Sequence, residues 1–250
     1  MSAALNSELH LAIDTSSLLT SIYLSQGSNV VGSLAVRISD RRSERLWSQI
    51  DFVIREAGLR VGDIDLFSVC TGPGGFTGIR VGMAAAKGLA MAAGRPLIGV
   101  TSLEAVAAAA GEGPAILAMT RASKGEVFSQ LFRCDALACP VAQEAPTVSS
   151  PDKAIEGVAA INQLIIIGDA ANDNADLIQK FASSKPGRRR RDWVLRPCPE
   201  MLAPFVARVA SARYQPGEYQ DSGRVRATYV RPAEAQTKLA LGLVGPGLRR

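Results

Sequence analysis

Histidine is nearly absent from this chain, whose 250 residues include only His10. A metal site built on a pair of histidines is therefore excluded, and a serine–histidine–aspartate triad is hard to assemble. The four cysteines form no C-x-x-C pair, which indicates reduced thiols rather than a zinc ribbon. Aromatic residues make up only 5% of the sequence and no basic stripe is interleaved with them, so a general nucleic-acid surface is not predicted.

Long apolar runs are missing as well. No segment is apolar over the length that a bilayer requires, and no charged-then-apolar leader opens the chain, so we expect a cytoplasmic protein without membrane contact. The net charge is only +5, and much of the excess lies in residues 188–191 and in the terminal pair Arg249 and Arg250. A run such as 188–191 is usually solvated, and direct RNA contact there is the less favoured interpretation.

A glycine-rich stretch with the sequence T-G-P-G-G-F-T-G-I-R occupies residues 71–80. It follows an apolar run, 66–70, that predicts a buried strand, and it leads into a predicted alanine-rich helix over 78–93. The unpaired N–H groups at the start of such a helix can bind a phosphate or a carboxylate. The candidate anion-binding residues are Gly72, Gly74, Gly75, Thr77 and Gly78.

This stretch is neither of the common phosphate loops. A Walker loop needs a lysine and a hydroxyl residue after its last glycine, whereas Gly78 is followed by Ile79 and Arg80. The dinucleotide fingerprint fails because Thr77 takes the place of the third glycine. The pattern leaves two interpretations open: a phosphate-type site, or a glycine turn that only lets strand and helix pack closely.

The first predicted strand, 9–13, ends in Asp14, Thr15 and Ser16. Short polar side chains suit a turn, and they could also reach a metal-bound phosphate. These three residues therefore join the candidate nucleotide or anion site.

Small residues recur every four positions along the predicted helix, at Gly78, Gly82, Ala86 and Ala90. They share one face and would leave a groove that another helix could approach closely. Packing against the domain's own sheet explains the same pattern equally well. Arg80 and Lys87 lie near this groove, where they could meet an anion, a partner's carboxylates or only solvent.

The predicted elements of the first half follow the order β-β-β-α-β-α-β-α. Tight turns make the first three strands antiparallel, and the later crossovers extend the sheet in parallel. This order predicts an α/β protein whose first half is the ribonuclease H-like half of an actin-like ATPase (ASKHA) fold. The expected elements are strands at 9–13, 20–25 and 30–36, a helix at 43–57, a strand at 66–70, a helix at 78–93, a strand at 97–100 and a helix at 101–110.

A glycine and proline break at 111–114 marks the expected domain boundary. We predict a first ribonuclease H-like domain over 1–110, a smaller α/β domain over 111–235 with a mixed sheet, and a flexible tail over 236–250. The second domain echoes the first loosely. Its expected elements are a hairpin at 115–120 and 126–133, a helix at 152–160, a strand at 164–167, helices at 174–183 and 200–214, of which the last could pack back on the first domain, and an extended piece at 228–232.

Several segments in this order resemble the TsaB family, also called YeaZ, whose members are needed to make threonylcarbamoyladenosine in tRNA. The resemblance runs from about residue 9 to about residue 235, and the long glycine motif is its most specific part. The matching segments are L-A-I-D-T-S at 11–16, S-E-R-L at 43–46, the glycine motif through 82, A-K-G-L-A at 86–90, G-E-V-F at 125–128 and Y-V-R-P at 229–232.

The resemblance implies an actin-like fold without catalytic residues or a metal of its own. It implies binding to the paralogue TsaD, which transfers the threonylcarbamoyl group to tRNAs that read codons beginning with A, together with TsaE. Contact with tRNA would be indirect, the free protein would be a homodimer, and ATP or ADP with Mg²⁺ at the complex interface is the candidate cofactor. The implied partner interface comprises Arg45, Trp47, Gln49, Arg80, Gly82, Met83, Ala86, Lys87 and Ala90.

Two positions depart from the family pattern: Arg42 stands where many relatives have histidine, and Arg121 places a cation where an acid is usual. A different function is also open, an ATP-dependent phosphotransferase of the sugar-kinase type. In that enzyme Asp14 would help to hold Mg²⁺, the glycine loop would bind phosphate, and Asp169 would be the second carboxylate. A metalloprotease, the third interpretation, lacks a histidine pair.

Overall fold

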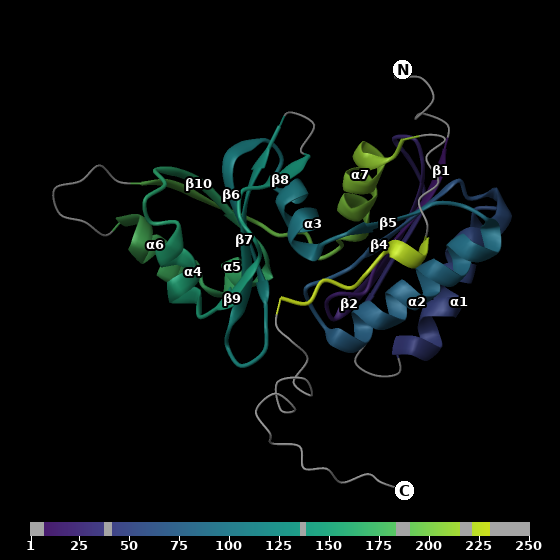
Figure 1. The fold of residues 1–250 in the computed structure, drawn as a ribbon, viewed down its shortest axis with the longest axis horizontal. Helices are drawn as coiled ribbons and strands as arrows, with labels where there is room; N and C mark the ends of the chain where they lie inside the picture. The colour runs from purple at the N-terminus through teal and green to yellow at the C-terminus, as the bar shows by residue number, and fades with distance from the viewer. Residues whose placement is uncertain (1–7, 38–41, 136–138, 184–190, 216–221, 231–250) are drawn as a thin grey trace, which may run out of the picture.

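A computed structural model describes residues 8–37, 42–135, 139–183, 191–215 and 222–230. The predictions made for residues 188–190 and for the tail at 236–250 lie outside these ranges. Figure 1 shows two α/β halves lying side by side, with the end of the described chain crossing from one to the other. No helix in the described part of the chain has the length and apolar character needed to span a bilayer.

The first half is built on a sheet with the strand order β3-β2-β1-β4-β5. β1 pairs antiparallel with β2 and parallel with β4, as the turn and crossover pattern predicted. Helices α1 and α2 cover one face of this sheet, and α3 and α7 cover the other (Figure 1). The elements are β1 (Leu9–Asp14), β2 (Leu19–Gln26), β3 (Asn29–Arg37), α1 (Arg42–Glu56), η2 (Val61–Asp63), β4 (Leu66–Cys70), α2 (Phe76–Ala93), β5 (Leu97–Val100), α3 (Ser102–Ala109) and α7 (Ala203–Arg213).

The second half repeats this topology. Its sheet runs β8-β7-β6-β10-β11, so the central strand β6 again has an antiparallel hairpin on one side and two parallel strands on the other. The predicted α/β fold with two ribonuclease H-like halves is therefore confirmed. The elements are β6 (Gly113–Arg121), β7 (Val127–Cys134), β8 (Pro140–Ala142), β9 (Thr147–Ser149), α4 (Pro151–Gly157), β10 (Gln163–Ile167), α5 (Asp169–Asp173), α6 (Ala175–Ser183) and β11 (Asp192–Arg196). The 3-10 turn η3 (Ser222–Arg224) returns to the first half, where it contacts α2.

Local signals placed several helix ends correctly. Thr101 and Glu104 form the predicted capping box, in which Thr101 Oγ1 accepts a hydrogen bond from the Glu104 N–H at 3.1 Å. Gly94 ends α2 in the left-handed conformation at φ 62°. That helix begins at Phe76, two residues before the predicted start, because Gly75 is its extended N-cap.

Besides the two 3-10 turns η2 and η3, four short strands and helices were not predicted. β8, β9, β11 and α5 have between three and five residues each, so they carry too few positions for a periodic pattern. The extended piece expected at 228–232 is described only to Val230, and that part pairs with no sheet strand. It lies instead along the glycine loop, where the Thr228 N–H donates to the Thr71 carbonyl oxygen at 2.8 Å.

His10 lies in β1 beneath α7 and is buried. Its Nε2 lies 2.8 Å from Ser68 Oγ and its Nδ1 lies 3.1 Å from Ser211 Oγ, and burial lowers the pKa of the imidazole to about 3. Because the unfolded chain binds this proton near the ordinary pKa of 6.5, the free energy of unfolding should fall as pH drops below that value. We expect a slope approaching about 1.4 kcal/mol per pH unit from this group alone.

Urea titrations between pH 7 and pH 4 test this expectation, with His10→Gln as the matched variant. Glutamine can still hydrogen-bond to the two serines but cannot titrate, so the variant should lose its share of the slope. Equal slopes for the two proteins would contradict the assignment of the pH dependence to His10.

Candidate functional site

The glycine loop is seated directly on the turn that follows β1. The Gly75 N–H donates to the carbonyl oxygen of Ser16 at 2.7 Å, and a Cβ added to Gly74 would lie 2.3 Å from the same oxygen. Gly72 has φ +96°, and a Cβ there would lie 2.7 Å from Ile79 Cδ1. Glycine at 72 and 74 is therefore required by close packing within the chain.

This contact encloses the predicted phosphate-facing turn. Asp14 and Thr15 are completely buried, and Ser16 is 6% exposed. Asp14 Oδ1 accepts a hydrogen bond from the Ser16 N–H at 2.9 Å, while Thr15 Oγ1 donates to the Gly78 carbonyl oxygen at 2.7 Å. Because the Asp14 side chain has no exposed surface in this arrangement, its carboxylate is closed to a metal-bound phosphate.

The buried side chain next to this carboxylate is the thiol of Cys70. Burial, and after it the negative charge of Asp14, raises the pKa of Cys70 well above its ordinary value. The thiol is therefore protonated and serves as a packing group.

The small-residue face of α2 also points inward. Gly78, Gly82, Ala86 and Ala90 are buried, and a Cβ on Gly82 would lie 2.2 Å from Thr15 Oγ1. Of the two interpretations of this pattern, the structure agrees with packing against the domain's own sheet, because the β1 turn and the sheet occupy these positions. Helical periodicity identified the residues that share a face but not the element that covers them.

The residues of the implied partner interface separate into three groups. The first group is buried and comprises Gly82, Met83, Ala86 and Ala90. The second group, Arg80 and Lys87, lies on the outer side of α2, and the third, Arg45, Trp47 and Gln49, lies on α1. Trp47 is 51% exposed and packs toward α2, where a Cβ on Gly88 would lie 3.7 Å from its ring. Arg45 and Gln49 are four residues apart and share the opposite flank of α1. The side chain of Arg42, at the start of that helix, is outside the described part.

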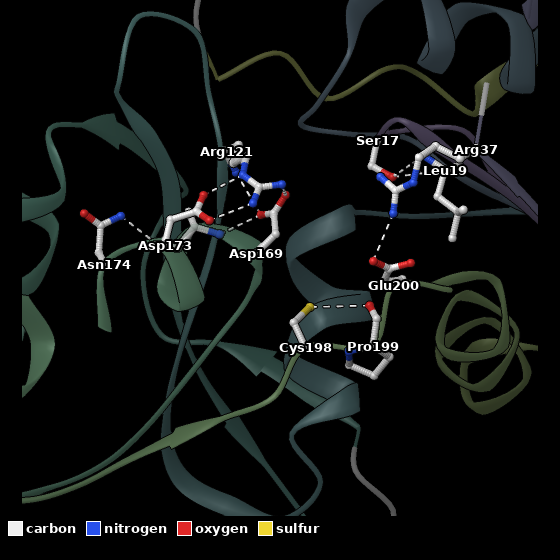
Figure 2. A network of polar contacts seen from close by, with 11 residues as sticks. Ser17, Leu19, Arg37, Arg121, Asp169, Asp173, Asn174, Cys198, Pro199 and Glu200 are labelled. Carbon is white, nitrogen blue, oxygen red and sulfur yellow. Dashed lines mark hydrogen bonds and ion pairs between the residues drawn. The ribbon is translucent and has the colours of Figure 1, made fainter. Parts of the chain in front are cut away.

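A cleft of 440 Å³ lies between the two halves. Figure 2 shows Arg121 pointing toward two aspartates of α5 on one side, and Arg37 pointing toward Glu200 on the other. The residues that line the cleft are Ser16, Ser17, Leu18, Leu19, Arg37, Pro73, Gly74, Gly75, Ser102, Val106, Thr120, Arg121, Asp169, Asn172, Cys198, Pro199, Glu200 and Leu202.

Arg121 binds the two aspartates on its side of the cleft. Its Nε and Nη2 donate to Asp173 at 2.5 and 2.7 Å, and its Nη1 lies 3.4 Å from Asp169 Oδ2 (Figure 2). The backbone N–H groups of Arg121 and Ala170 also donate to Asp169 Oδ1. Hydrogen bonds from the guanidinium lower the pKa of Asp173. Asp169, the second carboxylate of the kinase hypothesis, is therefore held by a cation.

The two charged groups on the other side of the cleft are also paired. Arg37 and Glu200 form an exposed pair at 2.9 Å, of a kind that contributes little to stability. Burial is the main cause that raises the pKa of Cys198 to about 12, so this thiol is protonated and is not a nucleophile at neutral pH. Within the described ranges, no three His, Cys, Asp or Glu side chains are grouped so that they could hold a metal ion.

Sequence reasoning missed the tie between the glycine loop and the end of the described chain. The hydroxyls of Thr71 and Thr228 lie 3.2 Å apart. The loop is also held from α3, where the Ser102 hydroxyl donates to the Pro73 carbonyl oxygen at 2.5 Å. The available signal was the Y-V-R-P segment at 229–232 in the resemblance, of which the structure describes residues 229 and 230. Neither periodicity nor turn chemistry indicated where that segment lies.

Comparisons with known proteins place this geometry in a family. Residues 28–165, more than half of the chain, match the family described as "TsaD: tRNA N6-adenosine threonylcarbamoyltransferase". The "tRNA threonylcarbamoyladenosine biosynthesis protein TsaB" of Haemophilus influenzae is 36% identical over 129 residues, which cover 49% of this chain and 53% of that protein. A "tRNA N6-adenosine threonylcarbamoyltransferase" of Erythrobacter litoralis is 43% identical over 75 residues, 30% of this chain and 21% of that protein.

The chain thus spans about half of the TsaB relative and about a fifth of the transferase. A crystal structure described as "an uncharacterized protein with similarity to peptidase YEAZ from Pseudomonas aeruginosa" matches 90% of this chain and 100% of that chain. Its TM-score is 0.73 at 22% sequence identity, which shows a shared fold. Taken with the paired sheets and the glycine loop, these matches show that the chain belongs to the TsaD family and, within it, to the TsaB (YeaZ) proteins.

Proposed function

We propose that this chain acts in the formation of threonylcarbamoyladenosine in tRNAs that read codons beginning with A. Its role is that of a non-catalytic partner subunit that binds and activates TsaD together with TsaE. The family membership and the names of the TsaB relatives support the pathway. The observation that supports the non-catalytic role is the complete burial of Asp14 in a turn on which the glycine loop packs through Ser16, because a phosphotransferase of this fold would need that carboxylate open to its metal.

The sugar-kinase alternative gains no support from the cleft. Its two carboxylates would be Asp14, which is buried, and Asp169, which accepts hydrogen bonds from Arg121 and from the start of α5. ATP or ADP with Mg²⁺ at the interface with TsaD remains part of the proposal. It does not depend on the Asp14 turn.

The outer surface of α1 and α2 is the proposed docking surface for TsaD. We call Trp47, Ala84, Gly88 and Met91 the α1–α2 face, because all four are exposed and the first lies against the third. Met91 is 72% exposed and Trp47 is 51% exposed, so large apolar groups are available for burial. Small residues at 84 and 88 would let a partner helix approach closely. In the absence of TsaD, a second copy of the chain could bind the same face.

Trp47→Glu should weaken binding to TsaD at least tenfold. A half-exposed tryptophan beside a glycine has the features of an interface hot spot, and truncation of such residues costs about 2 kcal/mol or more. Phe52→Glu is the matched control, because Phe52 is 56% exposed on the same helix but on the flank away from α2. Titration calorimetry with TsaD compares the two. Loss of binding in Phe52→Glu alone would move the interface to the Arg45 flank.

Reconstitution tests the proposed function itself. Threonylcarbamoyl transfer to tRNA is measured with TsaD, TsaE and the adenylate-forming enzyme, with and without this chain. Modified nucleoside should appear only when the chain is present, and the chain alone should show no turnover. A chain that is dispensable there, yet transfers phosphate from ATP by itself, would support the kinase alternative instead.

A further inference from the structure

Two segments that are far apart in the sequence run side by side on the first half: residues 71–94, which hold the glycine loop and α2, and residues 222–230, which we call the strap. The strap begins with η3 in contact with α2 and continues to the glycine loop at the start of that helix (Figure 1). Val225 and Ala227 pack against the core beneath α2. Arg224 and Arg226, which alternate with them, are exposed.

These segments bring four cations to one surface. Arg80 and Lys87 are seven residues apart on α2, so they share a side of the helix about 10 Å apart along its axis. Together with Arg224 and Arg226 they form what we call the basic ridge. No aspartate or glutamate occurs in residues 71–94 or 222–230, so both segments are purely cationic. The sequence does not indicate this ridge, because its two pairs of cations are separated by more than 130 positions.

Two aromatic rings lie at one end of the ridge. Phe76 is 42% exposed and Tyr229 is 47% exposed, and their ring centroids are 5.6 Å apart. The Arg80 guanidinium stacks over Phe76 at 3.6 Å, and its Nε donates to the Tyr229 hydroxyl at 3.2 Å. The cation and both rings are thus ordered before any ligand binds, while the rings keep large exposed areas.

The acidic residues at the other end of α2 do not neutralise this surface. Asp63, on the η2 turn that contacts α2, lies 3.7 Å from Arg60. Asp65, at the start of β4, lies 3.4 Å from Arg95 and also accepts the Leu9 N–H. Each carboxylate therefore has a nearby basic partner of its own.

We infer that the basic ridge binds RNA, with its cations on backbone phosphates and with Phe76 and Tyr229 available to unpaired bases. Cations without neighbouring acids favour a polyanion, and exposed aromatic rings beside arginine favour unstacked bases over duplex. The choice of tRNA as the ligand rests on the proposed function. This direct contact goes beyond the indirect role that the resemblance implied.

The ridge and the proposed docking face adjoin each other on the outer side of α2. Ala84 and Met91 each follow a ridge residue, Arg80 and Lys87, by four positions, so they share its side of the helix. Gly88 lies next to Trp47 toward α1, whereas Arg80 bonds to the strap at the other border of this surface. TsaD on the α1–α2 face would therefore leave the ridge at the border of the complex. An RNA held by the partner could reach it there.

The test is tRNA binding by the full chain carrying Arg224→Glu and Arg226→Glu. The matched control is Arg133→Glu with Lys153→Glu, which makes the same change in net charge at exposed sites in the second half. Fluorescence anisotropy with an unmodified tRNA transcript is measured for the free chain at low salt and for the complex with TsaD. We expect the ridge variant to bind at least tenfold more weakly and the control less than twofold. The slope of log K against log salt should fall by about 0.7 to 0.9 for each phosphate that the variant no longer neutralises.

A second pair of measurements addresses the aromatic end and the fold. Tyr229→Ala should weaken binding to an anticodon stem-loop more than binding to a short RNA duplex. An unchanged thermal midpoint for each variant excludes loss of structure as the cause. Ridge and control variants that bind tRNA equally would overturn the inference, and so would a ridge variant that loses TsaD but keeps tRNA, because the surface would then be a protein interface.

The inference and the proposed function can fail separately. If reconstitution shows the chain to be dispensable while tRNA binding still depends on the ridge, the proposed function fails and the RNA surface stands. If the chain is required but the ridge variant is fully active and binds tRNA normally, the proposed function stands and the RNA surface is rejected.

Discussion

Gly168→Ala is expected to unfold much of the second half of the protein. Gly168 joins β10 to α5 with φ +133°, a conformation that side-chain-bearing residues rarely adopt, and a Cβ there would lie 1.7 Å from the Met119 carbonyl oxygen. The neighbouring atom belongs to the backbone of β6, which is fixed by pairing with both β7 and β10. Strain and overlap together should cost about 4 kcal/mol or more, a large part of the stability of a typical domain.

Gly125→Ala tests a positive φ without any overlap. Gly125 also has a positive φ, +74°, but a Cβ there would meet nothing within 4 Å. Its cost should therefore be the conformational strain alone, about 1 kcal/mol. Urea unfolding of both variants makes the comparison. Similar losses in the two proteins would show that the overlap with Met119 is relieved without cost.

The first half was predictable because its signals are local and long. Nine-residue and eight-residue strands with a tight turn between them, and an 18-residue helix that ends in a left-handed glycine, have boundaries that can be read from the sequence. The strand order then follows from short connections and right-handed crossovers. In the second half the strand β11 has five residues at a sheet edge, with polar groups at both ends, so its sequence contains little pattern to read.

The candidate site was predictable only in part, because its decisive contacts join distant segments. Residues 71–80 indicated a close backbone approach, but the sequence could not say that Ser16, rather than a phosphate, is the group approached. Likewise, Arg121 was recognised as an unusual cation, whereas its aspartate partners lie about fifty positions away on α5. Such pairings arise from topology, which local pattern does not encode.

Gly74→Ala is expected to lift the glycine loop from the β1 turn. The added Cβ would lie 2.3 Å from the Ser16 carbonyl oxygen and 3.1 Å from Ser16 C and Cβ, so backbone must move rather than a flexible side chain. Such movement would also break the 2.7 Å hydrogen bond from the Gly75 N–H to that oxygen. We expect a loss of about 2 to 3 kcal/mol in the free energy of unfolding.

Gly62→Ala is the control for this substitution, because a Cβ on Gly62 meets nothing within 4 Å and its φ is not positive. It should leave stability within about 0.5 kcal/mol of the parent. The comparison by urea unfolding bears on function as well as folding. A stable Gly74→Ala protein would mean that the loop is not held on Ser16. The enclosure of the Asp14 turn, which is the main support for a non-catalytic role, would then be contradicted.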